Sequence, residues 1–181
     1  MNTQQPIGEH IYDSVVPEGI PAGARIILGY VDGHWPNYDR MKIVHPHAYI
    51  IPITVLGKPG IRIADCEPGN LSPEHAAKWA NNELKAGRKP TIYCSISTKP
   101  EIVKELEKLK ISPSAVDWFG AHWSFVGHTP TSTPQVPTGY VALQFAAEIP
   151  HNGHAYDESV TNGSWPWPVA APQTIKPIGC N

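Results

Sequence analysis

Short apolar runs recur along this chain and alternate with turn signals or helical stretches. Continuous runs of this length, rich in Ile and Val, are typical of strands buried on both faces, as in a parallel sheet covered by helices. The pattern predicts roughly eight strands. They are expected at 11–16, 24–31, 48–56, 61–67, 91–96, 116–125, 140–146 and 154–160.

Two stretches have the periodicity of helices, and both lie in the middle of the chain. Asn70 or Ser72 can cap the first helix, and Gly87 ends it. The second helix is expected over residues 100–110, where apolar residues recur on one face. Beyond it the helical pattern disappears, and 127–139, rich in Thr, Pro and Ser, predicts a long loop.

Strand–helix alternation predicts the α/β class, and eight strands predict a closed barrel of the (β/α)8, or TIM-like, type. A chain of 181 residues suits one domain but is too short to surround such a barrel with a full set of helices. We therefore expect a compact, reduced barrel over residues 1–161, in which loops replace several outer helices. Residues 162–181, dominated by Pro and Trp, are expected to form a tail that packs on the barrel or extends from it.

Charge and hydropathy exclude two classes of partner. The formal net charge is −2 and no run of Lys and Arg occurs, whereas general nucleic-acid binders neutralise phosphates with a basic surface. No stretch approaches the roughly 18 apolar residues that cross a bilayer, so no membrane partner is expected either.

The N-terminus is polar and lacks the apolar core of a signal peptide. If the protein acts outside a cell, we expect it to leave by lysis, by a dedicated apparatus or in a particle.

Asp65 and Glu67 are the sharpest candidates for chemistry. Side chains two positions apart in a strand point to the same face, so both carboxyl groups should project from the C-terminal end of the predicted strand, where barrels carry active sites. Neighbouring carboxyl groups repel, which keeps one protonated near neutral pH, and a protonated acid beside an ionised one suits cleavage of a glycosidic bond. The structural alternative is that the pair caps the following helix or meets a Lys or Arg.

Two further acids, Asp13 and Asp157, end predicted strands. If the barrel closes, its first and last strands are neighbours, so these two carboxyl groups come together and face the fourth strand across the mouth. Several acidic strand ends at one mouth are harder to assign to chance than one pair. Asp32 also ends a strand, but its Asp-Gly context indicates a turn.

The stretch RIADCEPGNLSPEHAAKWANNELKAGRKPTIYCS resembles the core of the family 25 glycoside hydrolases, the lysozyme-like muramidases. The shared pattern is a strand that ends in Asp-x-Glu, a helix with Ala and Trp, a Gly, and a strand with an Ile-Tyr pair. DWFGAHW, LQF and YDES are similar to later strands of that family, so the likeness runs in order from about Ile11 to Val160.

This resemblance implies hydrolysis of the β-1,4 bond between N-acetylmuramic acid and N-acetylglucosamine in the bacterial cell wall, with no cofactor and no metal. Carried over by position, Glu67 is the general acid. Asp65 is its partner, which stabilises developing positive charge or orients the substrate acetamido group, and Asp13 and Asp157 are supporting acids. The implied substrate-binding residues, for which core packing is an equal explanation, are Tyr93, Trp123 and Gln144.

Some features depart from the family. Its first strand usually reads Gly-x-Asp-x-Ser, whereas this chain has Tyr12-Asp13-Ser14, and the third strand, AYIIPITV, lacks an aromatic and polar ending. The chain is also short. These departures leave a second hypothesis open, in which an inactive barrel serves as a phage virion structural module or a cell-wall-binding module.

Geometry separates the two hypotheses. An open acidic groove at the strand ends favours the enzyme, which would be a bacteriophage lysin in the host cytoplasm before lysis, or a virion-associated hydrolase with other virion proteins as partners. Acids paired with Arg25, Arg62 or Arg88, or a blocked mouth, favour the module.

Histidines and cysteines offer weaker alternatives. His45-Pro46-His47 and His151-x-x-His154 contain metal-binding residue types, but both are expected in loops and lack the helical His-Glu-x-x-His setting of a zinc peptidase. Cys94 lies inside a predicted strand, which favours a buried thiol over a peptidase nucleophile, and Cys66 is expected to be buried in the same way.

Overall fold

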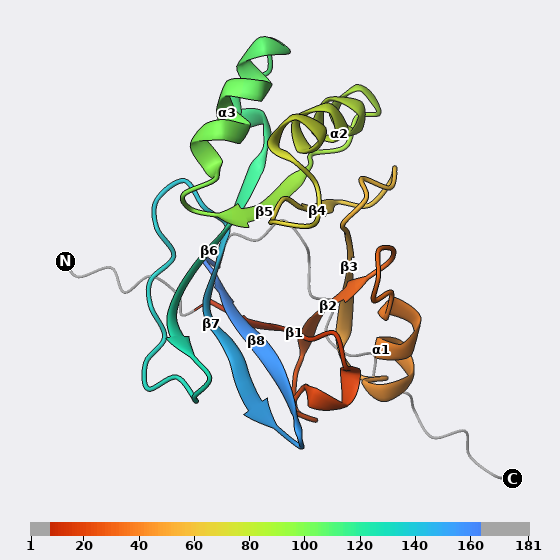
Figure 1. The fold of residues 1–181 in the computed structure, drawn as a ribbon, viewed down its shortest axis with the longest axis vertical. Helices are drawn as coiled ribbons and strands as arrows, with labels where there is room; N and C mark the ends of the chain where they lie inside the picture. Colours follow the sequence, from red (N-terminus) through yellow and green to blue (C-terminus); the bar gives the residue numbers. More distant parts are fainter. Residues whose placement is uncertain (1–7, 164–181) are drawn as a thin grey trace, which may run out of the picture.

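The computed structural model describes residues 8–163, and these residues form a closed barrel of eight strands (Figure 1). Each strand pairs with its neighbours in the chain, and the first pairs with the last. The α/β barrel predicted from the apolar runs is therefore confirmed. The strands are β1 (His10–Asp13), β2 (Ile26–Tyr30), β3 (Tyr49–Thr54), β4 (Ile63–Asp65), β5 (Thr91–Ser95), β6 (Asp117–Val126), β7 (Ala142–His151) and β8 (His154–Thr161).

Some strand ends differ from those predicted. β4 stops at Asp65, because the chain turns at Pro68 and Gly69, which has a φ of +92°, and Glu67 therefore lies in the loop beyond the strand. β7 continues past its predicted end and forms a hairpin with β8. His151 and His154, expected in a loop, are the paired ends of that hairpin.

The direction of β8 distinguishes it from the other strands. β1 to β7 pair in parallel, whereas β8 is antiparallel to both β7 and β1. The beginning of β8 therefore lies beside the C-terminal ends of the parallel strands, which form the mouth of the barrel. Asp157 was expected to end its strand. It lies within β8 instead, and it reaches the mouth because this strand runs the opposite way.

Three helices lie outside the barrel: α1 (Tyr38–Val44), α2 (Pro73–Lys85) and α3 (Lys99–Lys108). Short 3-10 helices cover Pro17–Gly19 and Pro113–Ala115. α2 and α3 lie side by side over one flank of the barrel (Figure 1).

The start of α2 agrees with its predicted capping. The Ser72 hydroxyl accepts a hydrogen bond from the His75 amide at 3.3 Å, so Ser72 and not Asn70 is the cap. α1 was not predicted from the sequence. It has 7 residues and buries Met41, too short an apolar pattern to stand out along the chain.

Side-chain alternation separates an aliphatic barrel interior from a polar mouth. On three strands an aliphatic interior residue is followed two positions later, on the same face, by a polar one. The pairs are Ile11 and Asp13, Leu28 and Tyr30, and Ile63 and Asp65. The inward face of these strands is thus apolar within the barrel and polar at the C-terminal ends of the strands.

Two further apolar clusters pack the outer elements on the barrel. One joins α2 and α3 to β4, β5 and β6, and it contains Cys66 and Cys94 as buried free thiols, as predicted. The other joins α1 to the β7–β8 hairpin. Within residues 8–163, no helix is long and apolar enough to cross a membrane. From residue 164 onward the predicted tail lies outside the described residues.

Candidate active site

The structure brings the four predicted acids together at the mouth. Asp13 ends β1 and pairs in register with Asp157 of β8. Asp65 ends β4, and Glu67 follows it in the loop. Burial, and then repulsion from the other three carboxyl groups, raise the pKa of Asp13 well above its usual range. Four carboxyl groups that act on one another in this way form a single electrostatic unit.

Asp65 has one oxygen bonded and one without a protein partner. Its side chain is 2% exposed. Oδ2 accepts a hydrogen bond from Asn70 Nδ2 at 2.8 Å, and Oδ1 is buried with no hydrogen-bond partner. Burial and then repulsion from Glu67 raise the pKa of Asp65 to about 8, against the opposing effect of Asn70. Asp65 therefore keeps its proton to a higher pH than an ordinary carboxyl group does.

Glu67 and Asp157 also have raised pKa values. Burial and repulsion from Asp157 raise the pKa of Glu67, and a hydrogen bond with Tyr93 opposes this shift. Burial raises the pKa of Asp157, while hydrogen bonds from the Glu148 backbone amide at 2.8 Å and from Gln144 at 2.6 Å lower it. The mouth thus holds carboxyl groups in different environments, which is how one site supplies both an acid and a base.

Tyr93 and Gln144 were expected to line a sugar cleft, and the structure buries both of them next to the acids. Tyr93 is 7% exposed and Gln144 1% exposed. The Tyr93 hydroxyl donates to the Gln144 carbonyl oxygen, and the Gln144 amide donates to Asp157. Because Tyr93 also bonds to Glu67, these two side chains connect acids on opposite sides of the mouth. Their contacts orient the acids.

A cleft of about 550 Å³ opens beside the acids. Asp65, Glu67 and Tyr30 line it together with the exposed side chains of Trp35 and Leu56. Its volume lies within the usual range of small-molecule sites, and it combines apolar walls with a few convergent polar groups. These are the features expected of a binding site.

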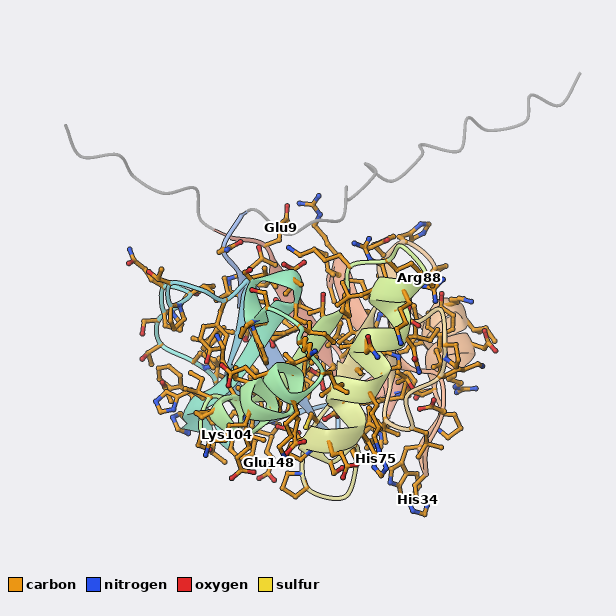
Figure 2. The ribbon with its side chains drawn as sticks, turned by 90° about the horizontal axis from the view of Figure 1, so that it is seen from above. Glu9, His34, His75, Arg88, Lys104 and Glu148 are labelled. Carbon is orange, nitrogen blue, oxygen red and sulfur yellow. The ribbon has the colours of Figure 1, made fainter. Side chains whose placement is uncertain are left out.

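Figure 2 helps to locate this end of the molecule. His34 lines the cleft from the loop after β2, and His75 belongs to α2. Both lie on the same edge of the molecule as Glu148, whereas Glu9 and Arg88 lie on the opposite edge. The cleft and the acids therefore share one end of the barrel.

Trp123, the remaining predicted substrate-binding residue, is 53% exposed on β6. It lies where the pairing of β6 with β7 shifts register, between Ala121 and Phe125. Trp123 is not among the residues that line the cleft of Asp65 and Glu67. The structure therefore does not bring this side chain to the cleft.

Sequence reasoning missed two contributors to the mouth. The Tyr30 hydroxyl donates to Asp13 at 3.4 Å, and alternation from Leu28 was the available signal for its inward position. Trp35 is 69% exposed in the cleft. It lies in a loop two residues after Gly33, where no periodicity indicates which way its side chain points. Asp32, interpreted as a turn residue, also lines the cleft.

Two of the arginines considered as partners for the acids bind other carboxylates. Arg88 Nε lies 2.5 Å from Glu83, and Arg25 Nη1 lies 3.4 Å from Glu9. Neither is therefore committed to the mouth acids. The cleft beside Asp65 and Glu67 is open, and these two arginines form their ion pairs elsewhere.

The histidine motifs do not assemble a metal site. No group of three or more His, Cys, Asp or Glu side chains within residues 8–163 has an arrangement that could hold a metal ion. His45 is buried, and its Nε2 donates to the Pro17 carbonyl at 2.9 Å, which is a structural contact.

Comparison with known proteins gives a relation of fold. No family model and no curated protein matches the chain. An uncharacterized protein of B. stearothermophilus is 12% identical with a TM-score of 0.54, over 85% of this chain and 96% of that one. The glycosyl hydrolase 25 GHIP of Streptococcus pneumoniae is 14% identical with a TM-score of 0.53, over 84% and 86% of the two chains.

A third solved structure is the catalytic domain of endolysin ply40 from bacteriophage P40 of Listeria monocytogenes. It is 10% identical with a TM-score of 0.51, over 86% of this chain and 94% of that domain. At such identities the likeness shows the fold. This chain therefore shares its barrel fold with a glycosyl hydrolase 25 and with an endolysin catalytic domain.

Proposed function

We propose that this protein is a peptidoglycan hydrolase of the N-acetylmuramidase type, which cleaves the β-1,4 bond between N-acetylmuramic acid and N-acetylglucosamine. The observation that carries the proposal is the pair Asp65 and Glu67, one buried and one half-buried carboxyl group with raised pKa values, which line an open cleft. The fold shared with a glycosyl hydrolase and an endolysin supports it. Cell-wall glycan is the proposed partner, with a lysin or a virion-associated protein as the setting.

Glu67 is the proposed general acid. Its pKa is raised by burial and by Asp157, so it retains a proton at a higher pH than an exposed Glu. In the reaction Glu67 gives this proton to the leaving oxygen as the bond from that oxygen to the anomeric carbon breaks. Water then adds a hydroxyl group to the anomeric carbon, and its remaining proton returns to the carboxylate, which restores Glu67.

Asp65 is the proposed partner of Glu67. It lines the cleft together with Glu67, and its proposed role is to orient the substrate acetamido group. Asp13 and Asp157 lie opposite each other on β1 and β8 and are the proposed supporting acids. Asp157 repels Glu67, so its proposed role is to keep the pKa of Glu67 high enough for it to act as an acid.

The test is release of new reducing ends from purified peptidoglycan of several bacteria. We expect the wild type to release them and Glu67→Gln to lose at least about a thousandfold of this activity. Glu74→Gln is the matched control, because Glu74 is an exposed acid on α2 that pairs with Lys78. It should keep wild-type activity.

No release by the wild type, across substrates and pH, would contradict the enzyme and favour the inactive structural or wall-binding barrel. Equal activity of the wild type and Glu67→Gln would show that another group supplies the proton.

A further inference from the structure

Three exposed apolar side chains gather at the cleft that contains Asp65 and Glu67. Val15 is 53% exposed, and Trp35 and Leu56 are each 69% exposed. Single exposed apolar residues are ordinary, but several around one concave site indicate a surface that is covered when a ligand binds.

Polar side chains fix the loops that carry these residues. Asp32 accepts hydrogen bonds from the Thr54 hydroxyl at 2.5 Å and from the backbone amides of Val55 at 2.7 Å and Leu56 at 3.3 Å. Gly33 has a φ of +86°, and a Cβ at this position would lie 2.3 Å from Val55 Cγ2. The loop after β2 is therefore closely packed against the end of β3.

Asn37 fixes the other end of the same loop. Its side chain is buried, its Oδ1 accepts from the Tyr30 amide at 2.9 Å, and its Nδ2 donates to the carbonyls of Ser14 at 2.7 Å and Val15 at 3.3 Å. Trp35 lies between Asp32 and Asn37. Its exposed indole thus stands on a loop that is held at both ends, which is the arrangement that a preformed binding surface requires.

The cleft continues beyond Leu56. A second hollow of about 400 Å³ shares Val55, Leu56 and Asn70 with the cleft and is also lined by His75 and Asn82 of α2. Two hollows that share a wall suit a chain-like ligand better than a compact one.

The lining selects the chemical class of that ligand. Carboxyl groups in the cleft repel anions, and amide side chains and an exposed indole suit neutral hydroxyl and acetamido groups together with an apolar face. We propose that Trp35 is the platform on which an uncharged N-acetylhexosamine ring of a glycan chain stacks, next to Glu67. This inference rests on the proposed function, since it assigns the recognition of the substrate to a residue outside the acid cluster.

The test measures binding without turnover. In a Glu67→Gln background, calorimetry would follow oligomers of β-1,4-linked N-acetylglucosamine. We expect Trp35→Ala to weaken binding about tenfold and Trp35→Phe to keep most of the affinity, because a flat aromatic face remains. Ile43→Ala is the control, since Ile43 is 74% exposed on α1 and does not line the cleft.

The outcomes separate the two proposals. Unchanged affinity in Trp35→Ala, or no binding of the oligomers to the Glu67→Gln protein while the wild type hydrolyses peptidoglycan, would overturn the role of Trp35 and leave the hydrolase intact. Oligomer binding that depends on Trp35, in a protein that hydrolyses nothing, would support the platform and refute the hydrolase. Melting temperatures of all variants exclude unfolding as the cause.

Discussion

Two carboxyl groups in this molecule are almost equally buried and have opposite pKa shifts. Glu83 of α2 is 1% exposed, and Asp65 of β4 is 2% exposed. Glu83 receives hydrogen bonds from Arg88 at 2.5 and 3.0 Å and from the Gly60 amide at 3.0 Å, and its pKa is lowered, chiefly by Arg88. Asp65 has one amide donor, a carboxyl neighbour and a pKa of about 8.

Burial alone therefore does not decide the charge of a carboxyl group here. It raises the pKa of both groups, but at Glu83 the hydrogen bonds from Arg88 outweigh it, whereas at Asp65 repulsion from Glu67 adds to it. Glu83 is ionised with both oxygens bonded, and it ties the end of α2 to the loop before β4. Asp65 has one oxygen without a protein partner. Its raised pKa lets it keep a proton at a pH where an ordinary carboxyl group is ionised. A group held in an unfavourable state within a cleft is a candidate for function, whereas a fully bonded one stabilises the fold.

The largest expected effect is the loss of activity when Asp65 is replaced. Asp65→Asn keeps the shape of the side chain but removes its acidic proton and one of its two oxygens, so we expect reducing-end release to fall about a hundredfold. Peptidoglycan hydrolysis at several pH values measures this. Full activity of the variant would place Asp65 with the structural acids.

The second test concerns the contribution of Glu83 to the stability of the fold. Arg88→Met leaves Glu83 buried without its cation, and we expect the free energy of unfolding to fall by about 2 kcal/mol, with unchanged activity of the folded fraction. Urea denaturation measures the loss. Lys78→Met is the control, because its partner Glu74 is exposed and the pair should contribute little. If both variants lost a similar free energy of unfolding, Glu83 would contribute no more to stability than an exposed acid does.

The pH dependence of stability gives a third test. The folded pKa of Asp65 lies above its unfolded value of about 3.8, so the wild type should lose stability as pH rises from about 4 to about 8. Asp65→Asn removes this contribution. We expect the variant to match the wild type near pH 4 and to exceed it by up to about 5 kcal/mol at pH 8. Parallel profiles of the two proteins would show that Asp65 ionises normally.

A smaller effect is expected from removing the Tyr93 hydroxyl, which bonds to Gln144 and Glu67. The hydrogen bond from Tyr93 lowers the pKa of Glu67, so Tyr93→Phe should raise that pKa and move the alkaline limb of the activity profile to higher pH. We expect about a tenfold loss at the optimum, because Glu67 and Gln144 lose a shared partner. A loss of activity without movement of the limb would indicate a packing role for Tyr93.

Much of the fold could be read from the sequence, because buried strands are continuous apolar runs and α2 has a capping Ser72 and a terminal Gly87. The site was accessible where it follows from strand periodicity, as for Asp13 and Asp65. The pair of Glu83 and Arg88 was not, since Arg88 comes after the helix and returns to it by way of Gly87, with a φ of +74°. Pairing of this kind depends on tertiary structure.

Other features could not be predicted for related reasons. Tyr93 and Gln144 were identified by their types, but their burial depends on which strands close over them. Trp35 lies in a loop where direction is set by Asp32 and Asn37, through contacts with β3 and with the loop after β1. Local pattern carries no information on such contacts.

The antiparallel β8 has a consequence for when the site comes into existence. Asp13 and Asp157 come from the first and last strands and meet through the pairing that closes the barrel. Contacts so distant along the chain form late, because the entropy of closing the long intervening loop must be overcome first. During synthesis, a chain whose last strand is still missing has an open edge and an incomplete set of acids. Assembly of the acidic mouth therefore requires β8, and a nascent or truncated chain that lacks this strand is expected to be inactive.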